Sequence, residues 1–215
     1  MWARRVFVTW SGLNVFAFGK LQFFPYRLNL VFDLDATLID TTHEKEAPGA
    51  DVHISFSGDR NYSVWFRPHV RQVLNLLKRF NSMYMFTAAT RSYTDSIVSQ
   101  LVSADFFDEI LYRDSLVSFM RRKHHRVSRE TSFSKDLTRL SAIRQSGAIE
   151  RSVLIDDKST NQVGDQHIIV VHPFDVSDKS WSNDVELLRV AGLILLCNLG
   201  GEEVTRRLLQ EAKNR

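Results

Sequence analysis

The chain has 215 residues, 44% of them hydrophobic and 25% charged, with a formal net charge of +3 and a single cysteine. This length allows one sizeable hydrophobic core and little more, so we expect one main domain. A single cysteine excludes an internal disulfide and a cysteine-based zinc cluster. We expect Cys197, which follows an apolar stretch at 190–196, to be a buried core thiol.

The first 32 residues hold four basic residues and no acid, a charge of +4 that leaves −1 for the rest of the chain. We define a basic leader at 1–27 ahead of a domain at 28–215, whose charge gives no support to nucleic-acid binding. The leader is also rich in aromatic residues, and its balance is typical of a mitochondrial targeting segment, although serine enrichment is lacking. The alternative is an ordered strand or helix that precedes the core.

The leader does not indicate a membrane anchor. Polar residues and Lys20 interrupt its apolar run, and no stretch reaches the ~20 apolar residues that a bilayer span needs. We therefore expect no transmembrane span. The expected compartment is mitochondrial if the leader is a targeting segment, and nuclear or cytoplasmic otherwise.

The first predicted strand, 28–34, ends in two carboxylates one residue apart, Asp33 and Asp35, followed by the hydroxyl of Thr37. Side chains alternate along a strand, so the two acids start on the same side and point into one small volume. A divalent cation would offset their repulsion, and a cation beside a carboxylate and a hydroxyl is a place for a phosphoryl group. The plainer alternative is that these residues cap the following turn. The pattern predicts phosphoryl transfer through an aspartate.

An insertion follows the first strand. The runs 54–56 and 64–66 flank a turn at 57–61 and predict a hairpin beside the site. We expect this hairpin to form a partial lid or a substrate wall.

Strand-like and helical runs then alternate along the chain. Strand-like runs lie at 28–34, 83–86, 109–112, 152–155 and 168–171, and runs with helical spacing lie at 72–80, 90–102, 136–144 and 184–196. This alternation predicts an α/β fold, a Rossmann-like parallel sheet with helices on both faces and a small hairpin insertion after the first strand. Ligands of such sheets bind at the carboxyl ends of the strands, where Asp33, Thr87 and Asp157 all fall.

Three further groups follow in order. Thr87, with Ala88, ends the second strand and offers a hydroxyl and helix amides to a phosphate, and its alternative role is an N-cap. Lys135 stands where a helix begins; such lysines are usually solvated and structural, but its place before 136–140 favours a role in the site. Asp156 and Asp157 follow a buried type of run, which favours a strand that ends at a cleft.

The second unusual feature is a basic stretch between the third strand and Lys135. It comprises Arg121, Arg122, Lys123, His124, His125 and Arg126, with Arg129 just beyond. Such stretches are usually solvated loops; the alternative is a basic wall that attracts an acidic or multiply phosphorylated substrate.

Together these motifs resemble the haloacid dehalogenase superfamily. The resemblance is to its Asp-x-Asp-x-Thr phosphatases, in the branch of the NLI-interacting-factor-like and CTD phosphatases that includes the small enzymes acting on RNA polymerase II. It covers roughly 28–197 and includes Arg67-Pro68-His69-Val70. The resemblance implies a nucleophile, Asp33, and a general acid and base, Asp35. It also implies four phosphate-binding residues, which are Thr37, Thr87, Ala88 and Lys135. The implied Mg²⁺ site comprises Asp33, Asp35, Asp156 and Asp157.

The chemistry explains why these residue types are needed. A carboxylate attacks a phosphate dianion poorly unless Mg²⁺ and a lysine offset the charge. Asp35 must be protonated when the leaving oxygen departs and ionised when water attacks, so we expect a moderately raised pKa, caused by its anionic neighbours. We favour Asp157 as the direct metal ligand. The small phosphatases commonly carry asparagine there, so this chain resembles the larger branch and has a more anionic metal site.

The expected function is that of a Mg²⁺-dependent phosphatase acting through an aspartyl phosphate, on phosphoserine or phosphothreonine in proteins. The competing class is a binding module: the presequence-receptor subunit of the mitochondrial inner-membrane translocase resembles the same fold, and import-machinery proteins would then be the partners. The leader favours it, while the full acid set and Lys135 oppose it. A small-molecule phosphatase is disfavoured because only the insertion at 40–66 is available to enclose a metabolite.

Overall fold

The structure is a computed structural model that describes residues 26–56, 60–120 and 131–213. Predictions for the leader, for the turn at 57–59 and for the basic stretch at 121–130 fall outside these residues. Tyr26, where the description begins, is buried and hydrogen bonds through its backbone to Asn198.

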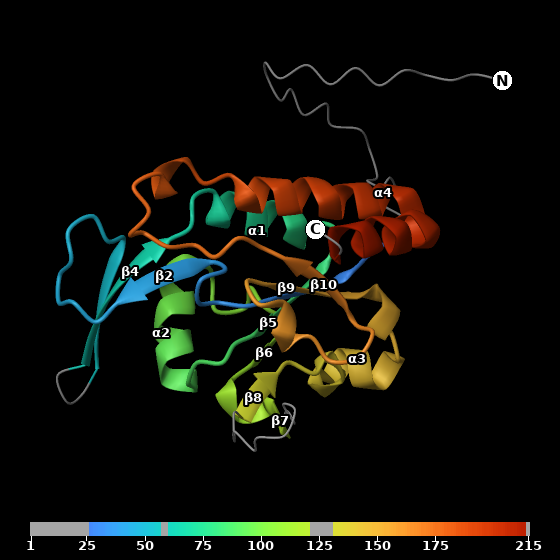
Figure 1. Cartoon of the computed structure of the whole chain (residues 1–215), viewed down its shortest axis with the longest axis horizontal. Coiled ribbons are helices and arrows are strands. Elements are labelled where there is room, and N and C mark those ends of the chain that lie inside the picture. The colour runs from blue at the N-terminus through green and yellow to red at the C-terminus, as the bar shows by residue number, and fades with distance from the viewer. Residues whose placement is uncertain (1–25, 57–59, 121–130, 214–215) are drawn as a thin grey trace, which may run out of the picture.

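The core is a five-stranded parallel sheet, as the alternating pattern predicts (Figure 1). Its order is β10-β9-β1-β5-β6, with β1 in the centre. The bounds of these strands are β1 Asn29–Phe32, β5 Ser82–Phe86, β6 Glu109–Leu111, β9 Ser152–Asp156 and β10 His167–Val170. Because β1 pairs with β5 and β9, the segments that follow these three strands emerge together at one edge of the sheet.

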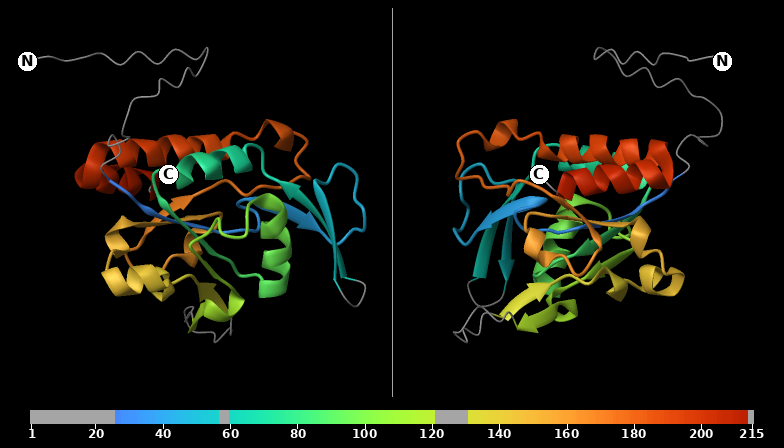
Figure 2. Two further views of the ribbon diagram at one scale, coloured as in Figure 1. Left: turned by 180° about the vertical axis from the view of Figure 1, so that it is seen from behind. Right: turned by 45° about the vertical axis from the view of Figure 1, so that its right-hand side comes forward.

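Helices cover both faces of the sheet, as Figures 1 and 2 show. The helices are α1 Val70–Lys78, α2 Arg91–Leu101, α3 Ser141–Ser146 and α4 Glu186–Lys213. Residues of β1 alternate between two hydrophobic clusters: Leu30 and Phe32 pack with α1 and α4, and Val31 packs with α3. Because helices pack on both faces of the sheet, successive residues of β1 and β9 are buried along the strand.

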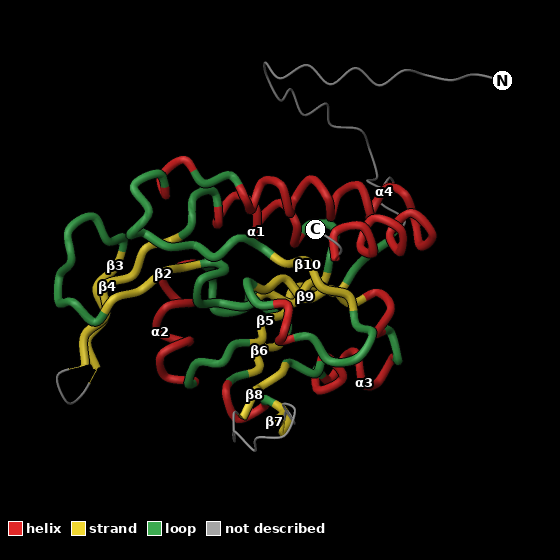
Figure 3. The backbone as a smooth tube through the Cα atoms, in the orientation of Figure 1, coloured by secondary structure: helices red, strands yellow, loops and turns green. Residues whose placement is uncertain are grey.

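The insertion after β1 is a three-stranded antiparallel sheet, one strand more than the predicted hairpin (Figure 3). Its strands are β2 Ile39–Thr42, β3 Val52–Phe56 and β4 Arg60–Phe66, in the order β2-β4-β3. The short strand β2 follows the Asp35 turn directly and pairs with β4. A further hairpin, β7 Val117–Met120 with β8 Thr131–Ser134, precedes Lys135.

Two predicted helices have different bounds in the structure. The prediction at 136–144 is wrong as a single helix: a 3₁₀ turn at Leu137–Arg139 is followed by extended backbone at Leu140, and α3 starts at Ser141. The Glu109 carboxylate stabilises this start, because it accepts hydrogen bonds from the backbone N–H and the hydroxyl of Ser141 at 2.7 and 2.6 Å.

The last helix extends well beyond the predicted 184–196. It runs to Lys213 with one break at Gly201, whose φ of 73° is non-helical. After the break the chain returns to the core, where Leu209 is buried and the Thr205 hydroxyl donates to the carbonyl of Cys197 at 3.1 Å. Cys197 itself is buried, as predicted. In the described residues, no helix combines the length and the apolar character that a membrane crossing requires.

Candidate active site

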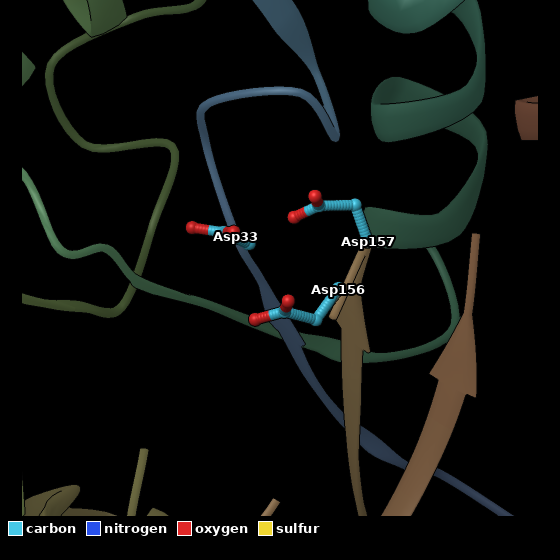
Figure 4. Close-up of side chains that lie close together, drawn as sticks. All are labelled: Asp33, Asp156 and Asp157. Carbon is cyan, nitrogen blue, oxygen red and sulfur yellow. The ribbon is translucent and has the colours of Figure 1, made fainter. Parts of the chain in front are cut away.

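Three aspartates meet where β1 and β9 end (Figure 4). Asp33 directly follows β1, and its backbone N–H donates to Ile155 of β9 at 2.9 Å. Asp156 is the last residue of β9, and Asp157 follows it. One carboxylate oxygen from each of the three lies within 4.8 Å of the others. The parallel pairing of β1 with β9 therefore builds this acid cluster from residues more than a hundred positions apart.

Lys135 joins two of these acids. Its Nζ lies 2.7 Å from Asp33 Oδ1 and 2.6 Å from Asp156 Oδ2, and only 1% of its side chain is exposed. The backbone of Lys135 is fixed as well, because its N–H donates to Asn161 and its carbonyl accepts from the Gln166 side chain. Burial by itself would lower the pKa of Lys135, but the two carboxylates outweigh it and raise that pKa. The lysine is therefore a buried, fixed ammonium ion and not the solvated residue of the plainer expectation.

Asp156 and Asp157 differ in how their oxygens are used. Both oxygens of Asp156 accept hydrogen bonds, from Lys135, from the side chain of Asn161 and from the backbone of Lys158. Asp157 Oδ1 is a buried atom without a hydrogen-bond partner in the described part of the chain. A buried carboxylate oxygen without a partner is costly unless a ligand binds it. This arrangement fits a direct metal ligand at Asp157 and an organising role at Asp156.

The acid cluster fits a hard divalent cation such as Mg²⁺. Opposite oxygens of an octahedral Mg²⁺ site are about 4.2 Å apart, close to the 4.8 Å spread found here. Burial raises the pKa of Asp33 to about 7 against the lowering effect of Lys135, and the Asp156 carboxylate adds to the rise. Burial likewise raises the pKa of Asp157. A bound cation would stabilise both carboxylates in the ionised form.

Asp35 lies apart from this cluster. Its side chain is not among the three that could hold a metal, so a ligand from Asp35 would have to be its backbone carbonyl. Its carboxylate Oδ1 accepts a hydrogen bond from the Tyr93 hydroxyl at 2.7 Å. The pKa of Asp35 is raised, as expected, but the main cause differs from the expected one: burial raises the pKa, while the Tyr93 hydrogen bond and the charge of Lys135 lower it. Asp35 faces a cavity of about 370 Å³ whose lining includes Tyr62, Tyr93 and Arg113.

The predicted phosphate-binding residues differ in burial and in hydrogen bonding. Thr37 is fully buried, and its Oγ1 has no hydrogen-bond partner in the described residues. Thr87 is buried just after β5, and its hydroxyl accepts the N–H of Ala89 at 3.0 Å. It is not an N-cap, because that position of α2 belongs to Thr90. Ala88 is exposed and lines the same cavity as Asp35.

Sequence reasoning missed the role of Arg67, which holds the loop after Asp35 in place. Arg67 is 1% exposed, and its guanidinium donates to the carbonyls of Thr37 and His172 at 3.1 and 2.7 Å. It also binds both carboxylate oxygens of Asp184, at 3.1 and 2.8 Å. The sequence carried one signal, an arginine directly after an apolar strand, but its partners lie far away along the chain.

Tyr93 and Asn161 were missed for a similar reason. Each is a single polar residue in a polar segment, and neither belongs to a motif of its own. Their importance comes only from contacts, of Tyr93 with Asp35 and of Asn161 with Asp156.

Two curated proteins are similar in sequence to this chain. Phosphatase Herzog of Drosophila melanogaster is 27% identical over 175 residues, which is 80% of this chain and 43% of the fly protein. An uncharacterised protein of Schizosaccharomyces pombe is 25% identical over 169 residues, 77% of this chain and 45% of that protein. The chain thus spans less than half the length of either relative.

Two solved structures are similar in fold. One is of an arginine-to-alanine variant of the fission yeast RNA polymerase II CTD phosphatase Fcp1 bound to beryllium fluoride, and the other is of Fcp1, an essential RNA polymerase II CTD phosphatase. Both are 20% identical to this chain and cover 87% of it, with TM-scores of 0.49 and 0.48, and the chain covers 54% and 62% of them. A family match extends over residues 28–201, which include all the predicted site residues. The chain therefore belongs to the NLI interacting factor-like phosphatase family.

Proposed function

We propose that this protein hydrolyses phosphomonoesters through an aspartyl phosphate on Asp33, with Mg²⁺ as its cofactor. The observation that carries the proposal is the buried pairing of Lys135 with Asp33 beside Asp157, whose Oδ1 has no partner in the described residues. The burial of a lysine and three aspartates at the carboxyl ends of two neighbouring strands costs folding free energy. A structural role alone does not explain that cost. Family membership supports the same chemistry.

Each residue has a distinct part in the proposed reaction. Asp33 attacks phosphorus, and Lys135 offsets the charge of the phosphate oxygens. Asp35, whose pKa burial raises, donates a proton to the departing oxygen and then takes one from the attacking water. The phosphate is held by the Thr37 hydroxyl, which has no partner in the described residues, and by the segment of Thr87 and Ala88.

The metal would be held by Asp33 and Asp157, with Asp156 arranging Lys135 and Asn161 beside them. When bound, Mg²⁺ polarises the phosphoryl group and offsets negative charge on the nucleophile and the phosphate.

The proposed substrate is phosphoserine or phosphothreonine in a protein. The cavity beside Asp35 is bounded on one side by the small insertion sheet, through Tyr62 of β4. An insertion of this size leaves room for a peptide chain and does not suit a fully enclosed metabolite. The resemblance to CTD phosphatases supports the same class of substrate.

The receptor alternative stays a prediction without support from the described residues. Residues 1–25 of the leader that favoured it lie outside them, and a binding module has no use for Lys135 paired with two acids. The proposed partner is therefore a phosphorylated protein.

The decisive experiment is a turnover assay with an aryl phosphate and then with a panel of phosphopeptides, with Mg²⁺ or with a chelator. We expect activity with Mg²⁺ that the chelator abolishes and added Mg²⁺ restores, because Asp33 and Asp157 need a cation to ionise together. Activity that persists after the metal is chelated would contradict the metal site. No turnover on any phosphate would favour the receptor alternative.

Replacement of the metal ligand tests the site directly. Asp157→Asn keeps an oxygen ligand but removes one charge, so the Mg²⁺ concentration for half-maximal activity should rise about tenfold. The measurement is a Mg²⁺ titration of the initial rate at saturating substrate. Asp165→Asn is the matched control, because Asp165 is exposed and lies outside the acid cluster. An unchanged Mg²⁺ titration of a folded Asp157→Asn protein would show that Asp157 is not a ligand.

A further inference from the structure

Tyr93 makes a contact with Asp35 that the proposed mechanism does not yet use. Its hydroxyl lies 2.7 Å from Asp35 Oδ1 and 3.2 Å from the Thr41 hydroxyl. The Tyr93 ring also packs edge-on against Tyr62 of β4, with centroids 5.1 Å apart and planes at 71°. Two strands of the insertion sheet thus fix a side chain of α2 against the proposed general acid.

The direction of these hydrogen bonds can be assigned. A tyrosine hydroxyl ordinarily has a pKa of about 10, so the phenol of Tyr93 keeps its proton at neutral pH. Its single proton is donated to the Asp35 carboxylate, and the Thr41 hydroxyl must therefore donate to the Tyr93 oxygen. The result is a chain of donors that runs from Thr41 through Tyr93 to Asp35 Oδ1.

This chain distinguishes the two oxygens of Asp35. Oδ1 accepts the Tyr93 proton, so a proton carried by Asp35 sits on Oδ2. We propose that Tyr93 is a positioning residue that orients Asp35 so that Oδ2 delivers the proton to the leaving oxygen; this role rests on the proposed function. As the bond between Asp33 and phosphorus forms, the bond from phosphorus to the leaving oxygen breaks. The Oδ2 proton then moves to that oxygen and leaves Asp35 ionised.

A competing role for Tyr93 is that of a substrate wall, since its ring lines the same cavity as Asp35. The two roles predict different kinetics. A wall changes KM, whatever the leaving group. A residue that orients the acid changes the rate of bond cleavage, and only where the leaving oxygen needs a proton.

The test uses Tyr93→Phe, which removes the hydroxyl and keeps the ring that packs against Tyr62. The substrates are a phosphoserine peptide, whose alkoxide leaves poorly without a proton, and 2,4-dinitrophenyl phosphate, whose phenolate leaves without one. Single-turnover release of the first product, with enzyme in excess, isolates the phosphorylation step. We expect the peptide rate to fall about 10- to 100-fold and the aryl rate to stay within about twofold.

Tyr112→Phe is a matched control. The Tyr112 hydroxyl donates to Asp95 of α2, the helix that carries Tyr93, also at 2.7 Å. Neither Tyr112 nor Asp95 belongs to the acid cluster or lines the cavity. The ratio of the two rates in Tyr112→Phe should equal the wild-type ratio.

A second test combines Asp35→Asn and Tyr93→Phe in one protein and measures the peptide rate again. In an Asp35→Asn background, Tyr93→Phe should cause no further loss on the peptide, because the acid that it orients is already gone. Equal losses on both substrates, a change in KM alone, or a further loss in the double variant would overturn this role. Failure of the wild-type protein to turn over either phosphate would instead overturn the proposed function itself.

Discussion

Asp33→Asn should lower turnover by about a thousandfold or more while the protein stays folded. The amide cannot attack phosphorus and carries no charge for a cation. The fold should survive because Lys135 keeps its 2.6 Å contact with Asp156, and the amide oxygen can still accept the N–H of Leu34. The measurement is kcat on an aryl phosphate at saturating Mg²⁺, together with the thermal unfolding midpoint.

The control for this variant is Asp105→Asn, because Asp105 is an exposed aspartate outside the acid cluster. Its kcat should match the wild type. Substantial turnover by a folded Asp33→Asn protein would end the aspartyl phosphate mechanism.

Arg67→Met should destabilise the protein by about 3 kcal/mol or more. The substitution keeps an unbranched apolar stem, but it removes the partner of Asp184 and leaves the carbonyls of Thr37 and His172 without their donor. An unpaired, partly buried charge is costly, and so are buried carbonyls without a donor. Urea unfolding at neutral pH measures the loss.

The matched control is Arg206→Met, which breaks a salt bridge of the same chemistry whose two side chains are largely exposed. Its effect should be below about 1 kcal/mol. Equal effects of the two substitutions would show that Arg67 is not the centre of a buried network.

The penalty of Arg67→Met should depend on pH. Burial would raise the pKa of Asp184, but the hydrogen bonds from Arg67 and from the Glu186 backbone, together with the charge of Arg67, outweigh burial and lower that pKa. In the wild type this pair therefore adds stability above the unfolded pKa of about 3.9 and loses it as the pH falls through the folded pKa. Without Arg67, burial favours the protonated acid, so the difference between the two proteins should be largest at neutral pH and shrink in acid. A pH-independent difference would contradict this pairing.

The sequence predicted the parallel sheet because each strand of its core is a continuous apolar run between polar segments. It predicted the meeting of Asp33 with Asp157 for a geometric reason, since both follow strands that point the same way. The register between strands and the partners of individual side chains could not be predicted from the sequence. The pairing of Asp184 with Arg67 joins residues 117 positions apart, and no local pattern contains it.

The cause of a pKa shift could not be predicted from the sequence either. The raised pKa of Asp35 was expected from neighbouring anions, whereas burial causes it. The extent of burial depends on how the insertion sheet and α2 close around the side chain, which is a tertiary property. The start of α3 at Ser141 is a tertiary property as well, because the acceptor of its first N–H is Glu109 of β6.

The return of α4 after Gly201 makes Cys197 a natural reporter of local opening. It is the chain's single thiol, it is buried, and burial raises its pKa to about 11, so at neutral pH it is neither accessible nor ionised. The segment that bears Thr205 and Leu209 lies over it. Labelling by a thiol reagent therefore measures how often this end of the helix detaches, without any engineered probe.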